Sequence, residues 1–306
     1  MDIPLFDGHC DAILRLYTDR SPTGALKKND NHVDLERGLR YSKYAQFFAL
    51  FGVPEMFPGK DGFEELYRRF RAELSPCRTA AEAAAAAERG QCAAFLSIEG
   101  AELIDCDPLR LEQAYEKGVR SICLSWNRAT RLCGSSAEDG GRGLSSEGRE
   151  FVMLANRLGM IVDVSHLSDA GVRDIAGMGI PFIASHSNSR AVYPHPRNLD
   201  DDMFRAVRDS GGTAGLNLFA DFLGEGCVTV EDVIRHAEHF LDLGGEKTLA
   251  IGGDLDGCDR LPEGIEGIQD MTKLYAAFAD RGYGKELLDD IFYNNLMRVV
   301  ERVCTI

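Results

Sequence analysis

Residues 161–186 read IVDVSHLSDAGVRDIAGMGIPFIASH. The stretch opens with an apolar run at 161–165, continues through a helical pattern at 169–176 and ends with a second apolar run at 182–185. Ser168 stands where a helix N-cap is favoured, and a glycine follows the last helical residue. A short apolar run, a helix and another short apolar run predict a βα unit of a parallel sheet.

The same unit recurs along the whole chain. The expected strands are residues 4–7, 45–51, 93–98, 121–125, 161–165, 182–185, 213–218 and 249–253. Helical patterns separate them, including an alanine-rich segment at 79–89 and a final helix at 285–303. Eight parallel strands close a barrel, and 306 residues suit one barrel with insertions. We therefore expect one domain, residues 1–306, folded as a single (β/α)8 TIM barrel.

Charge and hydropathy exclude two classes of partner. The chain has 34 Lys and Arg against 49 Asp and Glu, a net charge of −15, which disfavours a hold on nucleic acid phosphates. Its longest stretch without a formal charge, 175–189, is shorter than the roughly 18 to 20 residues that span a bilayer. We expect neither a nucleic acid partner nor a membrane span.

Two further features favour a cytoplasmic location. The first residues lead straight into an expected strand, without the basic and apolar regions of a secretory signal. The nine cysteines are odd in number and include no Cys-x-x-Cys pair, which disfavours a disulfide framework or a structural zinc cluster. We expect reduced thiols.

Histidines and carboxylates follow five of the expected strands. They are His9 and Asp11 after the first strand, Glu99 after the third, His166 after the fifth, His186 after the sixth and Asp254 after the eighth. The carboxyl ends of all strands of a parallel barrel meet at one mouth, so these side chains are expected to converge there.

The spacing of these residues suits metal ions. His9 and Asp11 are two residues apart on an extended segment, so both project the same way and could grip one ion. His166 and His186 follow consecutive strands and could grip a second, with Glu99 arriving between the two. Imidazole and carboxylate ligands suit zinc best, and manganese, cobalt or iron stay open.

Two other histidines point away from such a site. His236 and His239 lie three apart in a strongly charged helical pattern. We expect both on a solvent-facing side of that helix.

Five short motifs, in one order along the chain, resemble those of a known family. They are FDGHCD at 6–11, SIEG at 97–100, DVSH at 163–166, SHSNSR at 185–190 followed by PRN at 196–198, and GGDLDG at 252–257. The set is similar to that of the renal (membrane) dipeptidase family of the amidohydrolase superfamily, and it covers the chain from residue 6 to the final helix.

The resemblance implies a barrel of the metal-dependent hydrolase type with two Zn²⁺ per chain. It implies that His9 and Asp11 bind one zinc, that His166 and His186 bind the other and that Glu99 bridges them. It also implies that Asp254 is the catalytic acid and base, that Arg197 binds the C-terminal carboxylate of a dipeptide, and that the chain forms a homodimer.

One motif departs from the family pattern. Members carry a histidine that polarises the scissile carbonyl after the fourth strand, and the matching stretch here is LSWN at 124–127. Trp126 stands at the histidine position, where it would touch substrate, but its indole offers one N–H donor and no positive charge. Asn127 or a zinc ion could take over the role of the histidine.

The function expected from these residues is zinc-dependent hydrolysis of dipeptides, including those with a C-terminal D-residue, by a metal-bridging hydroxide. Asp254 would exchange protons with water and the leaving amine, and Asp256 is its rival for that role. A structural role of Arg197 as partner of the acidic residues 200–202 is also open.

Three other functions stay open. The first is a related binuclear-metal hydrolase of another small amide, a lactam or an ester. The second, of a different class, is a catalytically inactive metal-binding barrel. A metal nuclease is disfavoured by the charge of −15.

Overall fold

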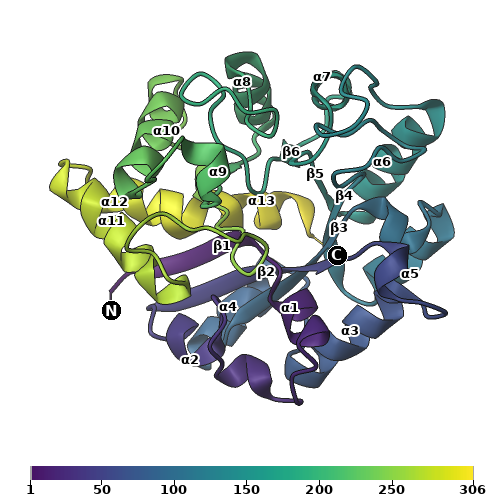
Figure 1. The fold of residues 1–306 in the computed structure, drawn as a ribbon, viewed down its shortest axis with the longest axis horizontal. Helices are drawn as coiled ribbons and strands as arrows, with labels where there is room; N and C mark the ends of the chain where they lie inside the picture. The colour runs from purple at the N-terminus through teal and green to yellow at the C-terminus, as the bar shows by residue number, and fades with distance from the viewer. Residues whose placement is uncertain (1, 306) are drawn as a thin grey trace.

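A computed structural model describes residues 2–305. Its eight strands form one parallel sheet in the order β6-β5-β4-β3-β2-β1-β8-β7 (Figure 1). The strands are β1 (Pro4–Cys10), β2 (Lys43–Phe51), β3 (Ala93–Glu99), β4 (Val119–Cys123), β5 (Ile161–Asp163), β6 (Phe182–Ile183), β7 (Ala214–Leu216) and β8 (Leu249–Ile251). Each of them lies within, or overlaps, a strand that the sequence predicts.

The sheet curls into a nearly closed barrel. β1 pairs with β8, and a parallel bridge between Ala184 and Ala214 joins the end of β6 to β7. The predicted barrel of the TIM type is therefore confirmed.

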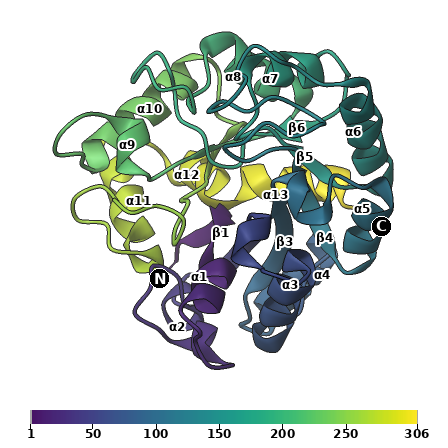
Figure 2. The ribbon, with the colours of Figure 1, turned by 45° about the vertical axis from the view of Figure 1, so that its right-hand side comes forward.

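Helices surround the barrel in both views (Figures 1 and 2). The α-helices are α1 (Ala12–Thr18), α2 (Leu35–Gly38), α3 (Gly62–Glu73), α4 (Ala80–Glu88), α5 (Pro108–Glu116), α6 (Ser146–Leu158), α7 (Asp169–Ala176), α8 (Asp201–Ser210), α9 (Ala220–Leu223), α10 (Val230–Asp242), α11 (Met271–Asp280), α12 (Lys285–Asp289) and α13 (Asn295–Val303). Short 3-10 helices are η1 (Ala25–Lys27), η2 (Pro54–Met56), η3 (Ala101–Ile104) and η4 (Ile268–Asp270), and η5 (Asp290–Asn294) is a π-helix.

Side-chain hydrogen bonds cap helices at their first turns, including the helix whose start the sequence predicts. Ser168 accepts a hydrogen bond from the backbone N–H of Gly171 and so caps α7. Thr229 and Asp232 form a reciprocal capping box at the start of α10. These bonds satisfy donors that a helix leaves unpaired at its first turn.

Aromatic side chains fill the barrel toward the amino-terminal ends of its strands. The rings of Phe6, Phe47 and Phe95 lie 5.3–5.6 Å apart, centroid to centroid. The predicted final helix is built from α12, η5 and α13 in succession, and α13 contacts β1, β5 and β8 (Figure 1). It therefore lies across the amino-terminal end of the barrel, where Asn295 donates to the carbonyl of Leu249 at 2.7 Å.

The chain leaves β6 by turning toward the barrel axis. A Cβ at Gly215 or at Gly252 would collide with the carbonyl oxygen of Ser185. Glycine is therefore needed at both positions, because the backbone at Ser185 passes directly over them. The inward turn carries the next residue, His186, into the middle of the barrel mouth.

Candidate metal centre and active site

The five predicted metal ligands converge at the carboxyl ends of the strands. His9 lies within β1 near its end, Glu99 ends β3, and Asp11, His166 and His186 follow β1, β5 and β6. All five side chains are buried. Residues as far apart in the sequence as 9 and 186 meet here because the parallel strands end at the same mouth.

Glu99 lies between two groups of predicted ligands. Its Oε2 is 3.2 Å from Nε2 of His9. Its Oε1 is 2.7 Å from Nε2 of His166 and 3.7 Å from Nε2 of His186. Each carboxylate oxygen therefore faces a different group, which is the arrangement that a bridging ligand requires.

Two trios of ligand atoms share Glu99, and in each the atoms lie within 4.8 Å of one another. One trio is His9, Asp11 and Glu99, and the other is Glu99, His166 and His186. Oδ1 of Asp11 and Nε2 of His9 are buried and have no well-directed hydrogen bond to any of the residues that the structure describes. Buried polar atoms ordinarily have a partner, so these atoms fit a cation that the donors would hold.

The charges differ between the two trios. Burial opposes a charge on His9, but the carboxylates of Glu99 and Asp11 raise the pKa of His9 well above its usual value. Burial lowers the pKa of His166 well below its usual value, and the Arg197 guanidinium adds to this. Burial also lowers the pKa of His186, together with the charge of His9. These shifts favour the positively charged imidazolium at His9 and the neutral imidazole at His166 and His186.

Asp254 lies beside the metal-ligand atoms. It belongs to a third compact trio with His9 and His186. Its backbone is in the left-handed region, with φ of 55°. Burial raises the pKa of Asp254 to about 6, which is the range useful to a group that both takes and returns protons near neutral pH.

Asn217 holds Asp254 in place, and the sequence did not reveal it. Its side-chain Nδ2 donates to Oδ2 of Asp254 at 3.0 Å, and its backbone N–H donates to Oδ1 of Asn188. Asn217 follows β7 directly, so its place at a strand end was the available signal. The predicted strand at 213–218 ran through Asn217, whereas the structure ends β7 one residue before it.

Arg197 reaches the same site from the loop after β6. Its side chain is buried, with Nη2 at 3.2 Å from Nε2 of His166 and at 3.4 Å from the carbonyl of His186. Nη1 donates to the carbonyl of Ser165. The ring of Phe222 packs against the guanidinium at 5.4 Å, and Nε of Arg197 is buried without a hydrogen-bond partner in the described part of the chain. The charged group therefore lies directly beside one metal-ligand trio.

The acidic run at 200–202 has other partners. Asp200 pairs with Arg173 at 2.6 Å, and Asp202 pairs with Arg205 at 2.9 Å. Arg197 therefore does not serve as the structural partner of these carboxylates.

Trp126 forms part of the wall next to His166. Its ring centroid lies 4.6 Å from that of Phe51 and 6.3 Å from that of His166. Within residues 2–305, no hydrogen-bond acceptor meets its indole N–H. Asn127 is already engaged, since its Oδ1 lies 3.2 Å from Nδ1 of His166 and so orients that ring with Nε2 toward Glu99.

Asp256 does not join the cluster. Its carboxylate accepts hydrogen bonds from the backbone N–H groups of His32 at 2.7 Å and Val33 at 3.2 Å. It therefore ties the loop after β1 to the loop after β8, which leaves Asp254 as the carboxylate of the eighth strand at the site.

The prediction for His236 is wrong. Its side chain is fully buried, where Nδ1 accepts from the backbone N–H of Ser189 at 3.0 Å and Nε2 donates to the carbonyl of Leu223 at 3.1 Å. The helix turns this residue inward because two backbone groups satisfy both ring nitrogens. His239 is partly exposed and pairs with Asp201 at 2.8 Å.

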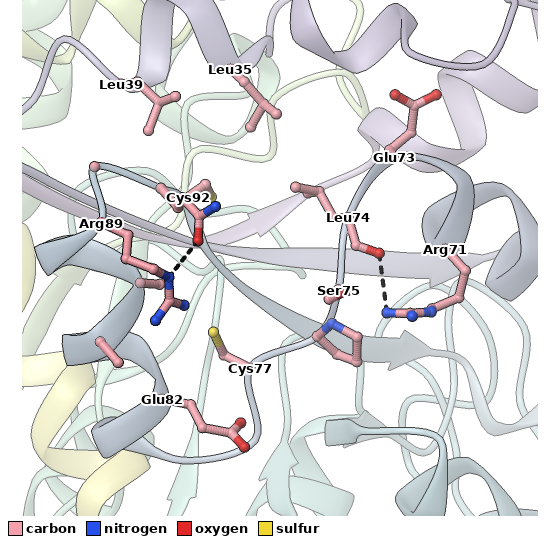
Figure 3. Close-up of a pocket in the computed structure, with 15 residues that line it drawn as sticks. Leu35, Leu39, Arg71, Glu73, Leu74, Ser75, Cys77, Glu82, Arg89 and Cys92 are labelled. Carbon is pink, nitrogen blue, oxygen red and sulfur yellow. Dashed lines mark hydrogen bonds between the residues drawn. The ribbon is translucent and has the colours of Figure 1, made fainter.

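A cavity of about 750 Å³ lies at the other end of the barrel, beside the start of β3. Figure 3 shows Cys77, Cys92 and Glu82 on its wall. Both thiols are nearly buried, and burial raises the pKa of Cys77 to about 11. The residues that line this cavity include none of the predicted site residues.

Comparison with known proteins decides the family. The profile described as "Membrane dipeptidase (Peptidase family M19)" matches residues 1–306. The chain belongs to the membrane dipeptidase family. This confirms the resemblance seen in the sequence motifs and the expected class of enzyme, a metal-dependent dipeptidase.

Individual relatives of this chain are also described as dipeptidases. An uncharacterized dipeptidase of Schizosaccharomyces pombe is 34% identical over 218 residues, which are 69% of this chain and 53% of that protein. The solved structure of dipeptidase AC, a metallopeptidase of family M19, is 30% identical, with a TM-score of 0.89 and coverage of 100% of both chains.

A further relative carries a bound ligand. A metallopeptidase from Rhodobacter sphaeroides, solved with a phosphinate mimic of the dipeptide L-Ala-D-Ala, is 29% identical with a TM-score of 0.87. The similarity covers 99% of this chain and 100% of that one.

The description of the family includes the word membrane, and a membrane span requires a helix of sufficient length and hydropathy. Across residues 2–305, the structure contains no helix with the length and apolar character needed to cross a bilayer.

Proposed function

We propose that this chain hydrolyses the amide bond of dipeptides at a centre of two zinc ions, with Glu99 between them. The observation that carries the proposal is the position of Glu99, whose two oxygens each face a separate set of histidine ligands. His9 and Asp11 would hold one ion, and His166 and His186 the other. When bound, such ions act as Lewis acids that lower the pKa of a water and polarise a carbonyl.

Asp254 is the proton carrier of this proposal. Its carboxylate would take a proton from the attacking water and return it to the leaving amine. Asn217 donates to Oδ2 of Asp254 and so fixes the plane of the carboxylate, leaving Oδ1 without a bond from that amide. A fixed orientation favours proton transfer because the group need not reorganise during the reaction.

Arg197 would select the substrate by its C-terminus. A guanidinium matches a carboxylate with two parallel hydrogen bonds, so a free C-terminal carboxylate beside the scissile bond would be bound best. Burial lowers the pKa of Arg197, which shows that the surroundings disfavour a lone positive charge. The carboxylate of a bound substrate would pair with this buried charge. In a longer peptide the terminal carboxylate would lie too far from the reacting bond to reach Arg197.

The relative solved with a mimic of L-Ala-D-Ala supports acceptance of a C-terminal D-residue. Trp126 would contact the substrate as part of the wall shared with Phe51. Its uncharged indole cannot supply the charge of an imidazolium, so the polarisation of the carbonyl would fall mainly to the metal ions.

The proposal extends to assembly and location. A homodimer is proposed from the family resemblance, and sedimentation of the purified protein would measure it. A reducing compartment such as the cytoplasm is supported by the nine cysteines, which are all unpaired.

The test is an assay of L-Ala-L-Ala and L-Ala-D-Ala before and after removal and return of zinc. We expect cleavage that is lost with the chelator and restored with zinc. We also expect the corresponding C-terminal amides to be cleaved at least about tenfold more slowly than the free dipeptides, since each 1.4 kcal/mol of lost binding is a factor of ten. Bound metal with turnover only of a lactam or ester would support the related hydrolase. Bound metal without any turnover would support the inactive barrel.

A further inference from the structure

The same dipeptide, Ser-His, follows two neighbouring strands. Ser165 and His166 follow β5, and Ser185 and His186 follow β6. Asp163, the last residue of β5, is buried between the two serines, with 5% of its surface exposed. This carboxylate touches no predicted metal ligand directly, yet it contacts the residue before each of two ligands.

Asp163 accepts four hydrogen bonds from these serines. Its Oδ1 accepts from the backbone N–H of Ser165 at 3.0 Å, from the Ser165 hydroxyl at 2.7 Å and from the backbone N–H of Ser185 at 3.0 Å. Its Oδ2 accepts from the Ser185 hydroxyl at 2.5 Å. One carboxylate therefore fixes both the backbone and the side chain of each serine.

The direction of these bonds sets the protonation of His186. The Ser185 hydroxyl has one proton, and Oδ2 of Asp163 takes it, because an ionised carboxylate can only accept. Oγ of Ser185 also lies 2.7 Å from Nδ1 of His186, so toward the imidazole it can only accept. Nδ1 of His186 must then carry the hydrogen, and its Nε2 is left with a free lone pair.

A second contact fixes the backbone of the same ligand. Oγ of Ser165 gives its proton to Asp163 and accepts the backbone N–H of His186 at 3.1 Å. The bare Nε2 of His186 then points at Nε2 of His166, 3.0 Å away, and at Glu99. Such outer contacts commonly decide the tautomer and ring orientation of a metal-binding histidine.

We propose that Asp163 is the positioning residue of the metal centre, and that through Ser185 and Ser165 it holds His186 in the tautomer whose Nε2 binds metal. This inference rests on the proposed function only in naming His186 as a metal ligand. The tautomer itself is a property of the metal-free protein, so it is measured independently of metal and of substrate.

The first test is nitrogen NMR of the histidine rings in the full-length, metal-free protein. The His186 signals are assigned by their loss in a His186→Asn variant. We expect a neutral ring with hydrogen on Nδ1 and a bare Nε2. Hydrogen on Nε2 of His186 in the wild-type protein would overturn the proposal.

The second test reverses the hydrogen-bond chain with Asp163→Asn. Three donors surround the Oδ1 position, so the amide oxygen of the new side chain must occupy it and the NH₂ group must face Ser185. Oγ of Ser185 would then accept from Asn and donate to His186, which moves the ring hydrogen to Nε2. We expect this tautomer change together with a loss of about 10–100-fold in affinity for one of the two metals in a chelator competition.

The matched control is Asp34→Asn. Asp34 is also buried, but it caps α2, and asparagine caps a helix equally well. The control should keep the tautomer of His186 and both metal affinities. Unchanged tautomer and unchanged affinity in Asp163→Asn would overturn the proposal.

Ser185→Ala is the second variant, and it also serves if Asp163→Asn does not fold. It removes the hydroxyl that contacts Nδ1 of His186, the one partner of this atom within residues 2–305, while Asp163 keeps its three bonds at Oδ1. We expect a mixture of the two tautomers and weaker binding of the same single metal. A Ser185→Ala protein with the wild-type tautomer and both affinities intact would contradict the role of the relay.

Discussion

The two halves of the proposed metal centre differ in charge. The acidic half, from β1 and β8, comprises His9, Asp11 and Asp254, and there the carboxylates raise the pKa of the histidine. The histidine half, from β5 and β6, comprises His166 and His186, whose pKa values are lowered by burial next to Arg197.

The difference assigns a task to each half. A site that moves protons needs a carboxylate with a pKa near the working pH, and the acidic half supplies Asp254. A site that receives a carboxylate needs a fixed cation, and the histidine half has Arg197 beside it. Glu99 joins the halves, so each can be disturbed separately and its task read out.

The largest expected effect comes from Asp254→Asn in the acidic half. Loss of the proton carrier should lower kcat by about 10²–10⁴-fold. Both metals should stay bound, because the trios that share Glu99 do not include Asp254. Dipeptide kinetics and metal analysis of the same preparation measure the two effects.

Asp259→Asn is the control for this variant, since Asp259 is an exposed carboxylate on the same loop. It should keep full activity. An Asp254→Asn protein with near wild-type kcat would remove the proton-carrying role from the acidic half.

A second variant disturbs the acidic half by size alone. A Cβ at Gly257 would collide with Oδ2 of Asp11 and lie 2.6 Å from Oδ1 of Asp254. We expect Gly257→Ala to weaken one metal by about 10–100-fold and to lower kcat, since contacts that orient a metal ligand have effects of that size. Chelator competition measures the affinity of each metal.

Gly141→Ala is the matched control, because no atom lies within 4 Å of the added Cβ. It should bind both metals as the wild type does. Equal weakening of both metals in Gly257→Ala would show that the halves are not separable.

Metal binding should depend on pH through Glu99 and His9. Burial raises the pKa of Glu99 to about 7 in the metal-free protein, so Glu99 holds a proton below that pH. A metal must displace this proton as well as the one on His9, so the affinity should fall as the pH falls and should fall more steeply below about 7. The expected loss is about tenfold per pH unit for each displaced proton.

Calorimetry of zinc binding in two buffers with different ionisation enthalpies counts the released protons directly. We expect more protons released at pH 6 than at pH 8, because a pKa of about 7 leaves Glu99 mostly protonated at the lower value and mostly ionised at the higher. An equal count at both values would contradict the raised pKa.

The smallest expected effect is at Trp126, at the edge of the histidine half. Trp126→Phe keeps an aromatic ring against Phe51 and removes only the indole N–H, which has no partner within the described chain. We expect kcat to change by about threefold or less, or roughly 0.6 kcal/mol. A loss of a hundredfold would show that the indole N–H stabilises the transition state.

The sequence predicted the eight strands because each is a short buried run between helices with clear starts. The residues that it proposes as ligands do lie at strand ends, but it made the later strands too long. The structure ends β5 at Asp163 and β6 at Ile183. Beyond these ends the pairing is reduced to single contacts such as the bridge between Ala184 and Ala214, and the backbone N–H groups of Ser165 and Ser185 donate to the side chain of Asp163.

Other features depend on contacts that no local pattern shows. The helical period predicts which face of the helix is buried. It does not predict that His236 lies on that face and bonds two backbone groups there. The bond from Asn217 to Asp254 joins two strand ends 37 residues apart. The position of α13 across the base of the barrel likewise depends on packing against Phe6 and the other buried side chains of its cluster.

The central claim is that two metals lie on either side of Glu99. Anomalous diffraction at the zinc absorption edge, from crystals of zinc-loaded protein, tests it most directly. The account predicts two peaks, one about 2.0–2.1 Å from a nitrogen of His9 and one at that distance from nitrogens of His166 and His186, each next to a different oxygen of Glu99. A single peak, or two peaks that both lie on one side of Glu99, would contradict it.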